Sequence, residues 1–120
     1  MNNIKEVSNR RLKVSEQIKY ALTQVIARGK IDDTRIQNSS VTITRVNVTP
    51  DLRIANCYFM PFLTNISQYE LLDAFDINKN QIRRLITSAV KLKYSPELRF
   101  FYDDGMDNLY KVESALRAIT

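Results

Sequence analysis

Lysine and arginine side chains are the groups in this 120-residue chain whose number and spacing most clearly suggest chemistry. Residues 1–30 carry seven of them against two Glu, and residues 79–99 carry six against one Glu, within a formal net charge of +5. If the fold brings these two basic blocks together, they would form a face that binds a polyanion. The alternative is that the charges only form the solvated surface of a basic protein. The candidate contact residues are Arg10, Arg11, Lys13, Arg45, Arg53, Lys79, Arg83, Arg84, Lys91 and Lys93.

Few other side chains are suited to catalysis or to metal binding. The chain has no histidine, which is the commonest metal ligand and the usual general base. Its single cysteine, Cys57, lies within an apolar run, so we expect a small buried side chain and no disulfide. We therefore expect a protein that is not an enzyme and that has no cofactor and no metal site.

Two groups of carboxylates could be mistaken for catalytic or metal sites. The segment 30–40 holds an adjacent pair of aspartates in a polar, turn-prone sequence, which we expect to be a solvated loop. Asp103, Asp104 and Asp107 lack the spacing of a calcium-binding loop, and capping of a following helix explains acidic residues at these positions. A metal-dependent nuclease built on these three aspartates is the enzymatic alternative.

The first half of the chain shows one helix pattern and two strand patterns. Apolar residues recur at helical spacing over residues 9–28. Residues 41–48 alternate as a strand as far as Ile43 and then shift phase, which is typical of an edge strand with a bulge. A Thr-Pro-Asp turn leads to a second strand over residues 53–60, so the two strands should form an antiparallel hairpin that Pro61 ends.

Two helix starts follow in close succession. An S-x-x-E capping box begins at Ser67, with apolar residues on either side placed as a hydrophobic staple. Asn78 is a good N-cap for a second helix, and Gln81 takes the position three residues later. Ile77 and Ile82 would form the second staple. We therefore expect two consecutive helices that meet at an angle near Asn78.

The second of these helices carries most of the second basic block. Its apolar arc runs from Ile82 to Leu92, while Arg84 and Lys91 face away from this arc and Arg83 lies at its margin. The Tyr-Ser-Pro step that follows should end the helix, because the residue before a proline is pushed toward extended conformations.

A third strand and a last helix complete the pattern. Residues 98–102 have aromatic side chains on both faces, among them Phe101, which suggests burial on both sides and leaves no exposed ring to stack on a nucleic-acid base. Apolar residues from Leu109 to Ile119 recur at helical spacing. The order helix, strand, strand, helix, helix, strand, helix predicts an α+β fold, with a three-stranded mixed sheet and helices on one face.

The chain should form a single domain, residues 1–120, with residues 1–7 flexible and an ordered core over about residues 8–118. No apolar run approaches the ~20 residues that span a bilayer, and the amino terminus lacks the apolar segment of a signal peptide. We expect a cytoplasmic protein with no membrane partner.

Two stretches resemble the ribosome-binding factor A family. The segment 46–59, VNVTPDLRIANCYF, is similar to that family's strand-turn-strand signature, and the segment 91–104, KLKYSPELRFFYDD, is similar to its helix-strand junction. A weaker match is DDTRI at residues 32–36. The resemblance covers residues 8–116 and implies a type II KH-like domain, α-β-β-α-α-β with a final helix.

The resemblance also implies a function. Members of the family are non-enzymatic assembly factors that bind the immature small ribosomal subunit and assist late maturation of its ribosomal RNA, with a role in growth in the cold. Where they carry an Ala-x-Gly kink between the paired helices, this chain has Asn78, Lys79 and Asn80. We further expect a monomer, RNA contacts through the basic face and no small-molecule substrate. The alternative is a protein-protein adapter that docks through its last helix.

Overall fold

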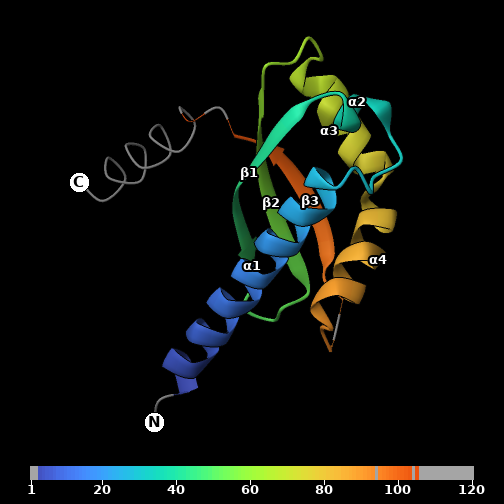
Figure 1. The fold of residues 1–120 in the computed structure, drawn as a ribbon. Helices are drawn as coiled ribbons and strands as arrows, with labels where there is room; N and C mark the ends of the chain where they lie inside the picture. Colours follow the sequence, from blue (N-terminus) through green and yellow to red (C-terminus); the bar gives the residue numbers. More distant parts are fainter. Residues whose placement is uncertain (1–2, 94, 104, 106–120) are drawn as a thin grey trace, which may run out of the picture.

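The structure is a computed structural model that describes residues 3–93, 95–103 and 105. Within these residues, three strands form one sheet and the helices pack against it (Figure 1). The predicted last helix and two of the three clustered aspartates, Asp104 and Asp107, lie outside the described residues. The elements are, in chain order, α1 (Asn3–Ala27), α2 (Thr34–Gln37), β1 (Ser40–Val48), β2 (Ile54–Phe62), α3 (Gln68–Ile77), α4 (Lys79–Val90) and β3 (Glu97–Tyr102).

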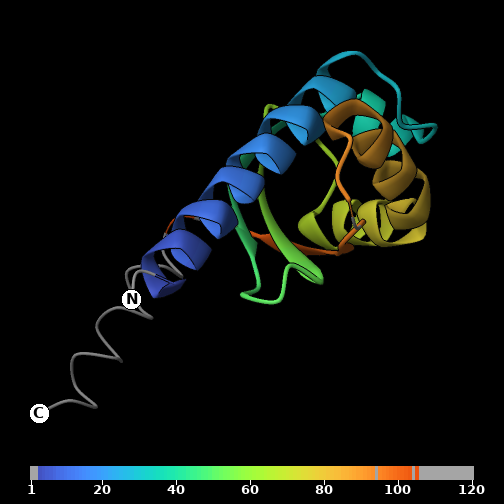
Figure 2. The ribbon, with the colours of Figure 1, turned by 90° about the horizontal axis from the view of Figure 1, so that it is seen from below.

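The sheet has the order β1-β2-β3, with β1 antiparallel to β2 and β2 parallel to β3. The register between β1 and β2 shifts between Ile43 and Arg45, so the bulge expected on the edge strand is confirmed. The helices of the described chain lie on one side of the sheet and leave its other side, the open sheet face, uncovered (Figure 2). The predicted α+β class, with a mixed sheet and helices on one face, is thus confirmed.

The core lies between the sheet and the helices. Its side chains with no solvent exposure are Ile18, Leu22, Ala55, Cys57, Phe59, Leu71, Ala74, Phe75 and Ile82. The centroid of the Phe75 ring lies 4.8 Å from the ring centroids of both Phe59 and Phe100. These ring contacts fix α3 against β2 and β3.

Helix α1 begins at Asn3, earlier than the apolar pattern predicts. The amide of Val48, at the end of β1, donates a 3.1 Å hydrogen bond to the hydroxyl oxygen of Ser15, and both residues are buried. Leaving such a buried amide without an acceptor costs about 1–3 kcal/mol, so this bond helps to hold α1 against β1. The position of α1 in turn decides which way its lysine and arginine side chains point. Although α1 has 25 residues, neither it nor any other helix of the described chain is long and apolar enough to cross a membrane.

The segment 30–40 is not the solvated loop that its polarity predicts. It contains the short helix α2, and the side chains of Ile31 and Ile36 are buried. Asp33 caps this helix, because its carboxylate accepts a 2.9 Å hydrogen bond from the amide of Arg35. Ile36 buries one side of this single helical turn, and Ile31 buries the segment before it, although the sequence around them is polar.

The segment between β2 and α3 confirms one prediction and corrects another. The hydroxyl of Ser67 accepts a 3.2 Å hydrogen bond from the amide of Glu70, as the predicted capping box requires. The prediction that Pro61 ends the strand is wrong, because β2 continues to Phe62. Beyond Phe59, β1 is the only strand of the described residues that pairs with β2, and such an edge position tolerates a residue that has no N–H group.

Helix α4 ends at Val90, before the Tyr-Ser-Pro step that was expected to end it. Lys91 adopts a left-handed conformation, with φ 57° and ψ 47°, and its amide donates to the carbonyl of Thr87. Glycine usually occupies this position, because it has no side chain to clash in the left-handed region. Lys91 thus ends the helix in a strained conformation and leaves a connection of several residues before β3.

The junction between α3 and α4 differs from the predicted second capping box. The side chain of Asn78 does not cap α4. Its Nδ2 donates instead to the carbonyl of Ala74 at 2.7 Å and to the carboxylate of Asp33 at 2.9 Å. Ile77 is 66% exposed, so it does not form a staple with the buried Ile82. The angle between the helices is therefore set by a link back to α2.

Asp33 is the centre of this link. Besides the amide of Asn78, its carboxylate binds the guanidinium of Arg35 at 2.8 Å, and the same guanidinium reaches Asp73 of α3 at 3.0 Å. The hydrogen bond from Arg35 is the main cause that holds the pKa of Asp33 below its usual value, and the two carboxylates raise the pKa of Arg35. One ionised carboxylate thus joins α2, α3 and the start of α4.

Candidate nucleic-acid interface

A groove of about 760 Å³ lies between α1 and α4. Its apolar lining comes from Ala21 and Val25 of α1 and from Leu85 and Val90 of α4. Exposed cations also line it, namely Lys13, Arg28 and Lys30. In this basic groove, cations of the first basic block lie beside the apolar side of α4, the helix that carries most of the second block. No cation of the second block is among the described residues that line it.

The arrangement of the groove follows from helical periodicity. Residues 13, 17, 20, 24 and 28 all line the groove, and their spacing of three or four residues places them on one side of α1. Tyr20, in the middle of this stripe, is 70% exposed. Of the groove cations, only Lys13 belongs to the predicted contact set. The same spacing, counted onward from Lys13, would have indicated Arg28 as well.

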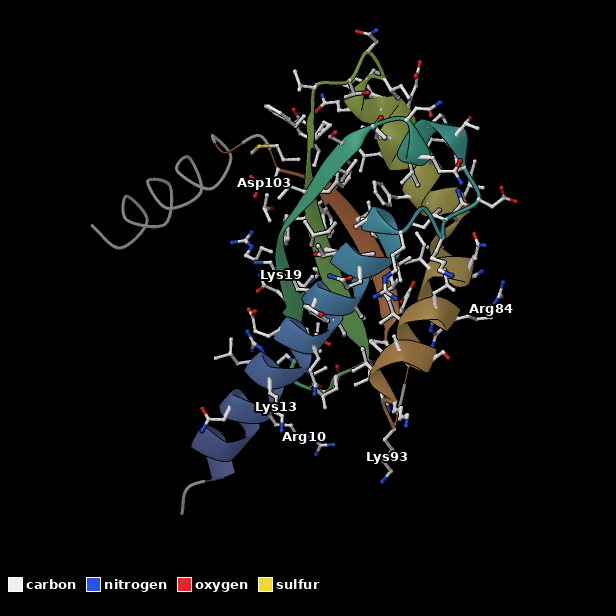
Figure 3. All side chains as sticks on the ribbon, viewed as in Figure 1. Arg10, Lys13, Lys19, Arg84, Lys93 and Asp103 are labelled. Atoms are coloured by element: carbon white, nitrogen blue, oxygen red, sulfur yellow. The ribbon has the colours of Figure 1, made fainter. Side chains whose placement is uncertain are left out.

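Other candidate cations lie toward one end of the molecule. Figure 3 shows Arg10 and Lys13 on the amino-terminal half of α1 and Lys93 beyond the end of α4, all at the same end of the fold. Lys91, the residue that ends α4, is also exposed and lies two positions from Lys93. Arg84 points outward from α4, away from α1 (Figure 3). The structure therefore gathers part of the predicted contact set beside the groove and separates Arg84 from it.

Arg83 has a structural role. Its Nε donates a 2.9 Å hydrogen bond to the hydroxyl of Ser95, and a terminal nitrogen donates to the Ser95 carbonyl. The hydroxyl of Thr87 lies 2.6 Å from the same Ser95 hydroxyl. Arg83 thus joins α4 to the segment before β3, and we assign it to this connection rather than to an outward contact.

Three further candidates lie away from the basic groove. The Nζ of Lys79 is 3.4 Å from a carboxylate oxygen of Asp76, at the junction of α3 and α4. Arg53 is exposed in the turn that precedes β2. Arg11 lies on the β1 side of α1, in a hollow that it shares with Arg45. The predicted contact residues are therefore divided between the helix side and the sheet side of the molecule.

The sheet side carries a stack that was not expected from the sequence. The guanidinium carbon of Arg45 lies 4.2 Å from the centroid of the Tyr58 ring, and Tyr58 stacks with Phe101 at 5.2 Å between centroids and 26° between planes. Phe101 is 40% exposed, so the prediction that this strand is buried on both faces is wrong for this residue. Its side chain lies on the open sheet face, whereas the neighbouring Phe100 packs against the core.

The metal site that Asp103, Asp104 and Asp107 could form is only partly open to inspection, because Asp104 and Asp107 lie outside the described residues. In the part of the chain that the structure describes, no three His, Cys, Asp or Glu side chains are grouped to hold a metal ion. Asp103 is 7% exposed, and its carboxylate accepts hydrogen bonds from the Thr44 hydroxyl at 2.7 Å and from the Gly105 amide at 2.9 Å. Asp103 thus ties the bulge of β1 to the end of β3.

Cys57 is fully buried in β2. Burial raises the pKa of its thiol to about 12, so the thiol is protonated at neutral pH. The predicted burial of this cysteine is confirmed.

Comparison with known proteins identifies the family to which this chain is similar. Residues 10–116 match the family model described as ribosome-binding factor A. The chain belongs to the ribosome-binding factor A family. It is 46% identical over 110 residues to the ribosome-binding factor A of Rickettsia africae, an alignment that covers 92% of each chain.

Solved structures of the ribosome-binding factor A family share this fold. The crystal structure of the protein from Thermus thermophilus matches with a TM-score of 0.65 at 20% identity, over 77% of this chain and 94% of that one. A homology model of the Thermus thermophilus protein, fitted into a cryo-EM map of its complex with the 30S subunit, matches with a TM-score of 0.59 at 20% identity, over 72% of this chain and 88% of that one. The KH-like fold that the resemblance implies is therefore confirmed.

In this member of the ribosome-binding factor A family, the expected Ala-x-Gly kink is replaced by Asn78, Lys79 and Asn80. The structure supplies another means of fixing the helix angle, because the amide of Asn78 reaches the carboxylate of Asp33. Asp33 belongs to the DDTRI segment that also resembles the family, so this segment takes part directly in fixing the paired helices.

Proposed function

We propose that this chain binds the immature small ribosomal subunit and assists the late maturation of its ribosomal RNA, without catalysing a reaction itself. Membership of the ribosome-binding factor A family supports this function, as does the Thermus thermophilus relative that was fitted into a map of a 30S complex. For this chain, the observation that carries the proposal is the basic groove, which unites cations from the first block with the helix of the second.

In this proposal the basic groove docks on the backbone of structured ribosomal RNA. Lys13, Arg28 and Lys30 are exposed and can each approach a phosphate. Every cation that neutralises a phosphate releases condensed counterions, so the affinity should fall steeply as salt is added. Phosphate contacts fix position but do not read sequence, so the specificity should come from the shape of the RNA.

Cations beyond the groove extend the same surface. Arg10 and Lys93 lie at the same end of the molecule as Lys13 (Figure 3). Lys91 is exposed at the end of α4. We expect these side chains, together with the groove, to contact consecutive phosphates of an RNA helix.

The test compares two double charge reversals that change the net charge equally. The groove variant carries Lys13→Glu and Lys30→Glu, and the control variant carries Arg53→Glu and Lys79→Glu, neither of which lines the groove. Co-sedimentation with immature small subunits is measured over a series of KCl concentrations. We expect weaker binding by the groove variant and a log-log salt slope that is smaller by about one for each phosphate no longer neutralised, with little change in the control.

Thermal melting of both variants excludes unfolding as the cause. If the groove variant sediments with small subunits as well as the native chain does at every salt concentration, the proposal is wrong. Binding that proves insensitive to salt would favour the adapter hypothesis, since contacts between proteins do not release the counterions of a nucleic acid.

A further inference from the structure

The open sheet face presents two rows of side chains that run across the strands. Arg45 pairs with Tyr58 in the register of β1 with β2, and Tyr58 pairs with Phe101 in the register of β2 with β3. Because side chains alternate between faces along a strand, the next row on the same face lies two residues away. That second row consists of Asn47, Asn56 and Arg99. We call these two rows the sheet platform.

The stack in the first row is open at one end. It begins with the Arg45 guanidinium 4.2 Å from the Tyr58 centroid and continues to Phe101, 5.2 Å from Tyr58. Phe101 belongs to β3, an edge strand, and no strand of the described chain lies beyond it. With 40% of its surface exposed, the Phe101 ring can accept a further flat ring against it.

The second row suits a nucleotide better than an apolar partner. Arg99 pairs with Glu97 at 3.7 Å, and both side chains are about half exposed, so this contact contributes little and is easily exchanged for a phosphate. Same-face neighbours on a strand lie about 7 Å apart, which places Arg99 within reach of the phosphate of a base that stacks on Phe101. The amides of Asn47 and Asn56 can donate to and accept from a base edge.

We propose that the sheet platform binds an unpaired base of single-stranded RNA, which stacks on Phe101 while Arg99 contacts its phosphate. The choice of RNA as the polymer rests on the proposed function, but the stack itself does not. Every base has a π-face, so this stacking tolerates any sequence. The chain then holds two RNA elements at once, a structured backbone in the basic groove and an unpaired nucleotide on the opposite side of the sheet.

The test uses the full chain and a short, unstructured, fluorescently labelled oligoadenylate RNA, with binding followed by fluorescence anisotropy. Phe101→Leu retains apolar bulk but removes the ring, so the affinity should fall by about fivefold or more. Phe101→Tyr retains the ring and should bind as the native chain does. Tyr69→Leu is the matched control, because Tyr69 is 74% exposed on α3, outside the sheet platform.

A second readout reports on the ring itself. The chain contains six tyrosines but no tryptophan, so Phe101→Trp introduces a single tryptophan at the end of the stack, which can be excited selectively at wavelengths where tyrosine does not absorb. Its emission should be quenched as the oligoadenylate binds. Three results would each overturn the proposal: equal affinities for Phe101→Leu and Tyr69→Leu, unchanged emission from Phe101→Trp at saturating RNA, or no binding by the native chain.

The two proposals fail separately. The variant with Lys13→Glu and Lys30→Glu leaves the sheet platform intact, so it should still bind the oligoadenylate in a way that depends on Phe101. If this variant no longer shows that binding, the sheet platform is not an independent site. Unchanged sedimentation of the same variant with small subunits would count only against the role of the basic groove.

Discussion

Replacing Asn78 by alanine should destabilise the junction of α3 and α4. The Asn78 amide donates a 2.9 Å hydrogen bond to the Asp33 carboxylate and a 2.7 Å hydrogen bond to the Ala74 carbonyl. A hydrogen bond to a charged group contributes about 1.5–3 kcal/mol, and one between neutral groups about 0.5–1.5 kcal/mol. Asp33 keeps its bonds from Arg35, and the Ala74 carbonyl keeps a bond from the backbone amide, so neither acceptor is left unsatisfied. We therefore expect the low end of the sum, about 2 kcal/mol.

Thermal unfolding followed by circular dichroism measures this loss. For a domain of this size each kcal/mol lowers the melting temperature by about 4 °C, so Asn78→Ala should melt about 8 °C below the native chain. Asn80→Ala is the control, because it makes the same chemical change at an exposed position in the first turn of α4. It should leave the melting temperature unchanged or raise it slightly, since alanine is the better helix former.

A double-mutant cycle with Asp33→Ala isolates the pair, because Asp33 also caps α2 and binds Arg35. Residues that share a hydrogen bond show coupling of about 0.5–3 kcal/mol, and we expect at least about 1 kcal/mol here. If Asn78→Ala and Asn80→Ala melt at the same temperature, or if the cycle shows no coupling, the link between Asn78 and Asp33 does not stabilise the junction of α3 and α4.

Two further predictions concern protonation. Because the folded-state pKa of Asp33 is lowered from 3.8, mainly by the hydrogen bond from Arg35, its stabilising effect is complete above that pH and is lost as the pH falls below it. The free energy of unfolding, measured with urea, should therefore fall more steeply below about pH 4 in the native chain than in Asp33→Asn, and equal slopes would contradict this. Cys57, with its thiol pKa raised to about 12 by burial, should not react with a thiol reagent at mildly alkaline pH until urea unfolds the chain, and rapid labelling of the folded protein would contradict its burial.

The features that the sequence predicts well depend on residues that are neighbours in the chain. Ser67 caps α3 because its hydroxyl needs to reach only three residues ahead. The phase shift after Ile43 predicts the bulge because the alternation of side chains along a strand is local. The Thr-Pro-Asp turn brings β1 and β2 together for the same reason. For the site, helical spacing alone places Lys13 on the groove side of α1.

Other features could not be read from the sequence, because they depend on residues that are far apart in the chain. Asn78 satisfies every local rule for an N-cap, but its amide donates to Asp33, which lies 45 residues earlier. Arg83 lies near the outward side of its helix, but Ser95 accepts its hydrogen bonds. A strand with rings on both faces does not reveal which face the helices leave uncovered, so the exposure of Phe101 could be found only from the assembled sheet.

At position 91, the residue that would give the more stable helix end differs from the residue that supplies a positive charge. A left-handed conformation costs a residue with a side chain about 1–2 kcal/mol, and glycine would end α4 at this position without that cost. Glycine would also remove an exposed cation from the second basic block. A selection for heat resistance and a selection for tight binding to a polyanion should therefore choose different residues at position 91.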